Sequence, residues 1–147
     1  MGMQWVVVAD SNRARIFQTA GNVQHLQEVQ DLLNPEGRMD DADLRHDAKG
    51  RFYGKGERDQ GHTAEPNVTK EAHDAEQFSR EIGRVLAEAC DAQRYDSLVV
   101  VAPPDFLGRL RRSLPERVER CVSHQLNREI ASWDSAHVEA YLKQALH

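Results

Sequence analysis

The sequence predicts a single α/β domain built on a mixed sheet of about five strands. Its 147 residues are a usual length for one domain, long enough to bury a core without disulfides or a structural metal. Two short β-branched runs, Trp5–Ala9 and Leu98–Ala102, are typical of buried strands. Between them, apolar residues recur at spacings of three and four over residues 68–93, which indicates a long helix. Strands and helices in one chain of this length favour the α/β class.

The first thirty residues are predicted to form three antiparallel strands in a meander. Trp5–Ala9 ends at Asp10-Ser11-Asn12, whose side chains commonly bond their own backbone in tight turns. Residues 14–19 resume the strand pattern, Gly21-Asn22 stops it, and residues 23–29 supply a weaker third strand. The second and third strands are therefore expected to follow the first through short turns.

The second half of the chain begins with the helix over 68–93 and continues with Leu98–Ala102, which we expect to be the central strand because it has the pattern of a strand covered on both faces. The apolar positions that define the helix are Ala72, Ala75, Phe78, Ile82, Val85, Leu86 and Ala89.

Three further elements close the predicted fold. Pro103-Pro104-Asp105 ends the strand and suits the first turn of a short helix, because this position tolerates proline and favours an acidic residue. Residues 121–128 fit a strand, although Val118, Cys121 and Val122 also suit a helix. The tail over 134–146 predicts a helix capped by Ser132 or Asp134.

A polar segment at about 34–66 contains five glycines and almost no aliphatic residues, so it cannot build a core of its own. Structureless connections of this length are uncommon inside a domain and are usually functional or disordered. We expect this segment to be a mobile loop with a functional role.

Within that segment, residues 45–58 carry five Lys or Arg against two acidic residues, a local charge of +3 in a chain of −5. Phe52 and Tyr53 lie among these cations, and such interleaving suits stacking on bases while phosphates are neutralised. The alternative is a solvated insertion whose aromatic residues dock on the domain.

A second basic cluster follows the strand at 98–102. Residues 105–120 contain five arginines and three acidic residues, and Arg109 and Arg112 would share a helix face. Guanidinium groups and a helix start at the carboxyl end of a strand both suit phosphate. An ordinary exposed helix face is the alternative, and Asp105 would repel an anion there.

Several classes of function have no support in the sequence. There is no GxSxG elbow, Walker loop or GxGxxG, and the histidines match no compact metal template. Cys90 and Cys121 lack CxxC spacing and are expected to be a buried, reduced pair, with a disulfide as the alternative. No cofactor or metal is expected, and no catalytic residue is assigned.

The N-terminus has no basic region and no long apolar run, so neither a signal peptide nor a membrane span is expected. The net charge of −5 argues against attraction of the whole surface to nucleic acid or anionic lipid. We therefore expect a cytoplasmic protein that does not bind membranes, and any contact with nucleic acid must come from a local basic patch.

Four stretches resemble the bacterial host-attachment protein family. They are residues 5–17, the polar Gly/Arg loop, Ala75-Glu76-Gln77-Phe78, and residues 100–111 with the segment Ala102-Pro103-Pro104-Asp105-Phe106-Leu107-Gly108. That family is distantly similar to the middle domain of archaeal and eukaryotic peptide-chain release factors. The resemblance implies a ribonuclease-H-like α/β fold with helices on both faces of a mixed sheet.

In the release factors, a basic loop with Gly-Gly-Gln precedes a long helix and assists hydrolysis of peptidyl-tRNA. The corresponding residues 54–61 here contain glycines, Lys55, Arg58 and Gln60, but no Gly-Gly-Gln. The resemblance therefore implies binding without the conserved catalytic element.

Three hypotheses follow. We favour an RNA- or ribosome-associated domain, with the ribosome or tRNA bound through residues 45–61 by Arg51, Lys55, Arg58 and Gln60. The first alternative is a protein-interaction module acting in attachment or surface regulation. The second is a release-factor-like hydrolase of the peptidyl-tRNA ester, using Gln60 to position water.

Overall fold

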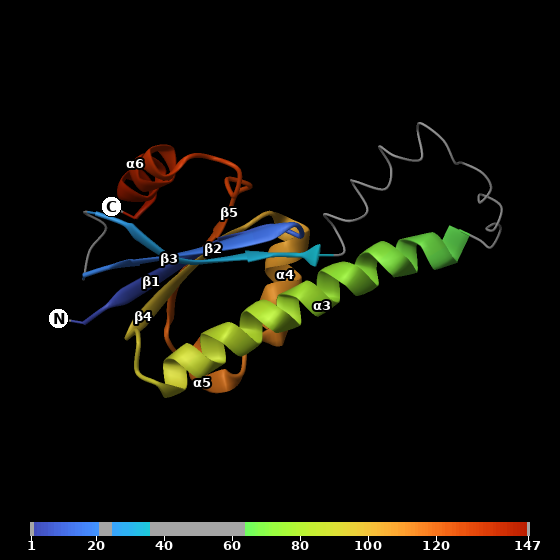
Figure 1. Cartoon of the computed structure of the whole chain (residues 1–147), viewed down its shortest axis with the longest axis horizontal. Helices are drawn as coiled ribbons and strands as arrows, with labels where there is room; N and C mark the ends of the chain where they lie inside the picture. The colour runs from blue at the N-terminus through green and yellow to red at the C-terminus, as the bar shows by residue number, and fades with distance from the viewer. Residues whose placement is uncertain (1, 21–24, 36–63, 147) are drawn as a thin grey trace.

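The computed structural model describes residues 2–20, 25–35 and 64–146, which contain one five-stranded sheet in the order β3-β2-β1-β4-β5. β1 pairs antiparallel with β2, and β2 with β3, while β1 pairs parallel with β4, and β4 with β5 (Figure 1). The predicted mixed sheet and its N-terminal meander are confirmed. The strands are β1 (Gln4–Ala9), β2 (Arg13–Thr19), β3 (Gln27–Leu33), β4 (Ser97–Ala102) and β5 (Val122–Asn127).

Residues 98–102 form an interior strand, β4, paired with β1 on one side and β5 on the other, and β1 is the middle strand of the five. Five residues in each of β1 and β4 are buried, because both strands have a neighbour on either side and helices on both faces. The apolar run in each segment predicts a buried strand in both cases, so it does not tell the middle strand from its neighbour. Which strand lies in the middle depends on partners that are distant in the sequence.

Helices cover both faces of the sheet, as expected. α3 (Ala64–Asp91), α4 (Pro104–Ser113) and α5 (Glu116–Glu119) lie on one face, and α6 (Ser135–Ala145) lies on the other (Figure 1). Alternation along β1 divides the core accordingly, since neighbouring strand residues point to opposite faces. Trp5 and Val7 join the core beneath α3 and α4, whereas Val6 and Val8 join the core beneath α6.

The third strand and the polar loop have different boundaries from those predicted. β3 runs over Gln27–Leu33 rather than 23–29, in the register that pairs Leu33 with Arg13 and Gln27 with Gln18. Asn34 is buried, and residues 64–66 belong to α3, so the segment predicted as a loop loses residues at both ends. The expected mobility of the remaining residues, 36–63, lies outside the described part of the chain.

The first turns of α3 extend past the sheet (Figure 1). The helix begins at Ala64, but the first buried residue among 70–91 is Phe78, with Ala75 partly buried one turn earlier. Residues 64–74 correspond to about 16 Å of helix at 1.5 Å per residue. The first turns of α3 therefore lie away from the core.

Close packing of α3 on α4 depends on Gly83. A Cβ atom at this position would lie 2.7 Å from the carbonyl oxygen of Ser113, so a larger side chain requires the helices to separate. Nearby, the hydroxyls of Ser79 and Ser113 are 3.0 Å apart across the same contact. Gly83 thus allows the two backbones to approach closely.

Gly83→Ala is expected to lower the free energy of unfolding by about 1–3 kcal/mol, because overpacking outweighs the roughly 1 kcal/mol that alanine gains over glycine in a helix. Gly108 on α4 offers a matched control, since its added Cβ would meet only the end of the Arg112 side chain at 3.6 Å. Gly108→Ala should be neutral or stabilising in the same urea titration. Equal effects of the two substitutions would contradict the proposed role of Gly83.

Asp134 is the N-cap of α6, which decides between the two predicted caps. Its Oδ1 atom accepts hydrogen bonds from the His137 backbone N–H at 2.9 Å and pairs with His137 Nδ1 at 2.7 Å. The backbone hydrogen bond, followed by the side-chain contact, lowers the pKa of the Asp134 carboxyl below its usual value. The folded state therefore favours the charged carboxylate.

Asp134→Ala is expected to lower the melting temperature by a few degrees at pH 7, because the cap is lost. A carboxyl whose pKa is lowered by folding stabilises the fold above its unfolded pKa and loses this effect as the pH falls through the folded pKa. The difference in melting temperature between wild type and Asp134→Ala should therefore disappear below about pH 4. Melting curves recorded between pH 7 and pH 2.5 measure this difference. A difference that is unchanged at the lowest pH would contradict the role of Asp134 as a charged cap. Asp134→Ser retains a cap without this acid dependence and serves as the control.

Candidate functional site

A hollow of about 430 Å³ lies at the carboxyl ends of β1 and β4. These strands are parallel, so their ends meet at one edge of the sheet, where ligands of α/β proteins commonly bind. The start of α4 lies there, at the carboxyl end of β4 as the sequence predicted, and the turn after β1 lies beside it. The lining residues are Asp10, Ser11, Asn12, Glu71, Ala72, Ala75, Pro103, Pro104, Asp105, Phe106, Arg109 and Glu129.

The turn at one side of the hollow is held by its own hydrogen bonds. Asp10 Oδ1 accepts from the backbone N–H groups of Asn12 and Arg13, at 2.8 and 2.9 Å. Asn34 fastens the end of β3 to this turn, because its Nδ2 donates to the Ser11 carbonyl at 2.9 Å. The sequence predicted that side chains of this turn bond their own backbone. It did not predict the hydrogen bond from Asn34, which directly follows another strand, β3.

The helix start at the other side of the hollow is poorly suited to phosphate. Pro103 occupies the N-cap position without a side-chain hydrogen bond, and Asp105 lies in the first turn of α4. Of the described residues, four acidic ones line the hollow, against the single cation Arg109. The excess of negative charge opposes anion binding at this helix start.

Arg109 and Arg112 have different surroundings, although both lie on α4. Arg109 is half-buried, and its Nη1 donates to Glu76 Oε1 on α3 at 3.2 Å. Arg112 is exposed and does not line the hollow. The structure therefore brings only Arg109 of this predicted pair to the candidate site, and its charge is balanced there by Glu76.

Two further arginines of the predicted basic cluster are also paired with carboxylates. Arg117 makes a two-pronged contact with Asp91, at 2.7 and 3.0 Å, and Arg120 bonds Glu116 at 3.1 Å. The contact with Asp91, which lies outside residues 105–120, reduces the positive potential that the local sequence suggested. Ion-pair partners on another helix were not visible in the local charge count.

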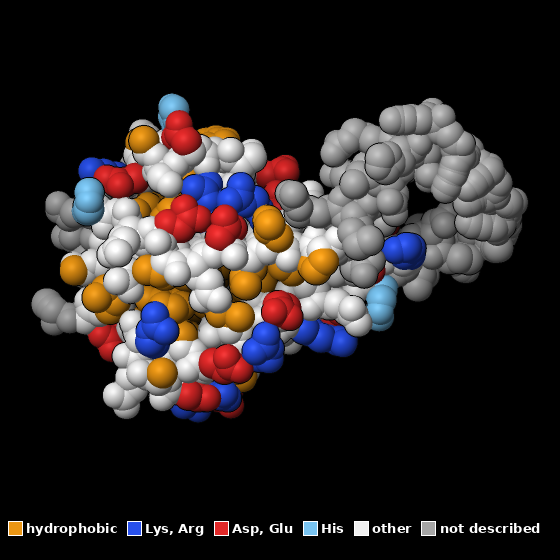
Figure 2. Space-filling model, viewed as in Figure 1, with side chains coloured by type: hydrophobic (Ala, Val, Ile, Leu, Met, Phe, Trp, Pro, Cys, Tyr) orange, Lys and Arg blue, Asp and Glu red, His pale blue; other side chains and the backbone are white. Residues whose placement is uncertain are grey.

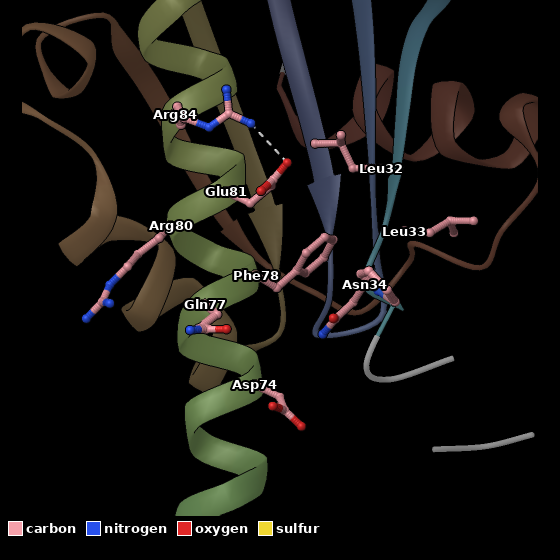
Figure 3. Close-up of a pocket in the computed structure, with 10 residues that line it drawn as sticks. Leu32, Leu33, Asn34, Asp74, Gln77, Phe78, Arg80, Glu81 and Arg84 are labelled. Carbon is pink, nitrogen blue, oxygen red and sulfur yellow. Dashed lines mark hydrogen bonds and ion pairs between the residues drawn. The ribbon is translucent and has the colours of Figure 1, made fainter. Parts of the chain in front are cut away.

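A second hollow, of about 540 Å³, separates the end of β3 from α3 (Figure 3). Leu32, Leu33 and Phe78 supply apolar surface, while Glu81 and Arg84 form an ion pair on its α3 side at 3.0 Å. Figure 2 shows hydrophobic side chains gathered in the middle of this face, with charged side chains above and below. Among the described residues, Leu33 is the one large hydrophobic residue that is exposed, at 48%.

A family described as "Protein required for attachment to host cells" matches residues 5–142. The chain belongs to this host-attachment family. The resemblance deduced from the sequence is thus confirmed over nearly the whole chain. No curated protein sequence matches it.

Solved structures similar to this host-attachment protein include one named "Archaeal protein", with 12% identity and a TM-score of 0.44. Another is an archaeal translation termination factor, with 10% identity and a TM-score of 0.48. Each match covers 97% of this chain, which spans 36% of the first structure and 37% of the second.

The remaining predicted binding residues of this host-attachment protein are Arg51, Phe52, Tyr53, Lys55, Arg58 and Gln60, and all lie outside the described residues. Among residues 2–20, 25–35 and 64–146, no group of three or more His, Cys, Asp or Glu side chains could hold a metal ion. No helix within these ranges is long and apolar enough to cross a membrane. The sequence did not predict the second hollow, the groove between β3 and α3 that Leu33 and Phe78 line. The apolar pair Leu32-Leu33 beside a polar segment was the signal for it.

Proposed function

We propose that this host-attachment family protein is an RNA-binding domain that contacts ribosomal RNA or tRNA through residues 45–61. The observation that carries the proposal is the local charge of +3 over residues 45–58 in a chain of net charge −5. Nucleic-acid affinity is dominated by neutralised phosphates, so a local excess of cations matters more than the charge of the whole chain.

The charge pattern of α3 gives the domain body little capacity to bind phosphate. Arg80 lies 3.7 Å from Glu76, and Arg84 contacts both Glu81 and Glu88. The positive side chains of this helix are therefore interleaved with acidic partners. Contacts with RNA are assigned to the loop because its cations outnumber its acidic residues.

The direction of α3 supports the same assignment. The helix extends past the sheet before residue 75, so its first turns lie away from the sheet (Figure 1). Charges separated by more than a Debye length of about 8 Å are largely screened at physiological salt. The start of α3, which closely follows the basic segment in the chain, is therefore less affected by the acidic residues at the sheet.

The loop contains residue types for both parts of RNA recognition. Arg51, Lys55 and Arg58 would contact phosphates, and Phe52 would stack on a base. Gln60 can donate and accept hydrogen bonds at base edges. Ester hydrolysis is not part of the proposal, since residues 54–61 lack Gly-Gly-Gln.

The test is the salt dependence of binding to a fluorescently labelled single-stranded RNA. Three phosphate contacts predict a slope of about −2 in log K against log salt, at roughly −0.7 per contact. Replacing Arg51, Lys55 and Arg58 by alanine should remove most of this slope. Replacing Arg80, Arg84 and Arg117 by alanine changes the net charge equally and should leave the slope nearly unchanged.

Phe52→Ala separates stacking from charge. This variant should weaken binding by about 1–3 kcal/mol with little change in salt slope, because stacking releases few counterions. Absence of RNA binding at low salt, or equal weakening by the two triple substitutions, would contradict the proposal.

Pull-down from lysate with and without ribonuclease distinguishes RNA from a protein partner. Loss of ribosomal material after nuclease supports RNA binding. If the same proteins are captured after nuclease treatment and Leu33→Ala removes them, the groove between β3 and α3 is a protein-binding surface and the RNA proposal is wrong. Exposed Leu33 is the observation that favours this second candidate.

A further inference from the structure

Two cysteine thiols meet at the end of the domain opposite the extended turns of α3. Cys90 lies in the last turn of α3 and Cys121 directly precedes β5, and both are free and half-buried. The Sγ atoms of both residues contact the same acceptor, the backbone carbonyl of Arg117, at 4.0 Å from Cys90 and 3.6 Å from Cys121. The cysteines are unpaired and pack against the core beneath α3 and α4, but they are only partly buried, which corrects the expectation of a fully buried pair.

The backbone on both sides of this thiol pair is well anchored. The Cys121 N–H donates to the Val118 carbonyl at 2.9 Å, and its own carbonyl accepts from the Leu98 N–H at 2.8 Å. The two-pronged contact of Arg117 with Asp91 joins α5 to the end of α3 beside the cysteines. The fold consequently keeps the two sulfur atoms close together.

The surroundings of the Cys121 thiol favour its protonated form. Burial, followed by the nearby Cys90, raises the pKa of the Cys121 thiol. Burial also raises the pKa of Tyr95, with further contributions from both cysteines, and its hydroxyl donates to the Leu86 carbonyl at 2.7 Å. Because the thiolate is the reactive form, the raised pKa of Cys121 slows its reaction with oxidants, so oxidation at this thiol requires an excess of peroxide.

We propose that Cys90 and Cys121 are a reversible disulfide site that responds to peroxide. One thiolate attacks a peroxide oxygen, which forms a sulfenic acid and releases water from hydrogen peroxide. The second thiol attacks that sulfur, so an S–S bond forms and the hydroxyl leaves as a second water. Two thiols are oxidised and one peroxide is reduced, and a dithiol reverses the reaction.

The disulfide would tie the end of α3 to the start of β5 across thirty intervening residues. A cross-link of this length restricts the unfolded chain and stabilises the folded one, provided that the native geometry is not strained. The inference uses none of residues 45–61, so it does not rest on RNA binding.

The test uses the full chain, reduced with dithiothreitol, desalted and treated with hydrogen peroxide at low protein concentration. Mass spectrometry after N-ethylmaleimide labelling in denaturant should show two labels before oxidation, none after it, and two again after reduction. Peptide mapping should find Cys90 and Cys121 in one linked peptide. The melting temperature should rise by about 10 °C on oxidation.

Cys90→Ala and Cys121→Ala should each abolish both the linked peptide and the rise in melting temperature. Circular dichroism checks that each variant folds. Two labels after peroxide treatment of folded wild type would overturn the proposal. So would a linkage that forms only after unfolding in urea, or an oxidised protein that melts no higher than the reduced one.

Discussion

Replacing Val100 with aspartate is expected to abolish cooperative folding. Val100 lies in β4 and is 1% exposed, in the core beneath α3 and α4. Its backbone lies between Val7 of β1 and Gln125 of β5, so an introduced carboxylate cannot reach water without disrupting the sheet. An unpaired buried charge costs at least several kcal/mol, against roughly 5–15 kcal/mol for the stability of a whole domain.

Gln125→Asp is the matched control for this prediction. Gln125 pairs with Val100 in the sheet register but is exposed, so the same side chain there remains hydrated. Circular dichroism during heating should show a cooperative transition for Gln125→Asp and none for Val100→Asp. A melting curve of Val100→Asp equal to that of wild type would show that this position is not part of the core.

Arg15→Ala is expected to lower the free energy of unfolding by about 2–4 kcal/mol. Arg15 is 6% exposed, and its guanidinium joins β2 to the segment before α6. It donates to the carbonyls of Ala131 and Trp133, to Ser135 Oγ, and to Glu28 on β3. Loss of the donor leaves two carbonyls without their partner, and each unsatisfied buried group costs about 1–3 kcal/mol.

Two other variants separate the parts of this network. Glu28→Gln removes the charge partner but keeps the backbone contacts, and should cost about 1 kcal/mol or less because Glu28 is partly exposed. Arg15→Lys should restore only part of the lost stability, because an ammonium group lacks the planar fork that serves several acceptors. Urea unfolding measures all three variants, and an Arg15→Ala midpoint within error of wild type would contradict the assigned role.

Local pattern was sufficient for most secondary structure. The β-branched runs that became β1 and β4, and the apolar spacing of Phe78, Ile82 and Leu86 in α3, all predicted the correct element type. These patterns work because alternation and helical spacing reflect the burial of a segment's own faces. The predicted boundaries of β3 differ from the observed ones, because the register of this strand depends on its pairing with β2 and its own residue pattern is weak.

The candidate sites depended more strongly on contacts between distant segments. The sequence by itself determined the α/β class, the helical and extended segments, and the basic character of residues 45–58. Only the tertiary structure placed β1 in the middle of the sheet, paired Arg109 with Glu76, and brought Cys90 and Cys121 to one carbonyl group. Side-chain periodicity identifies the faces that a segment buries, but the partner of a charge or a thiol is decided by how separate elements pack together.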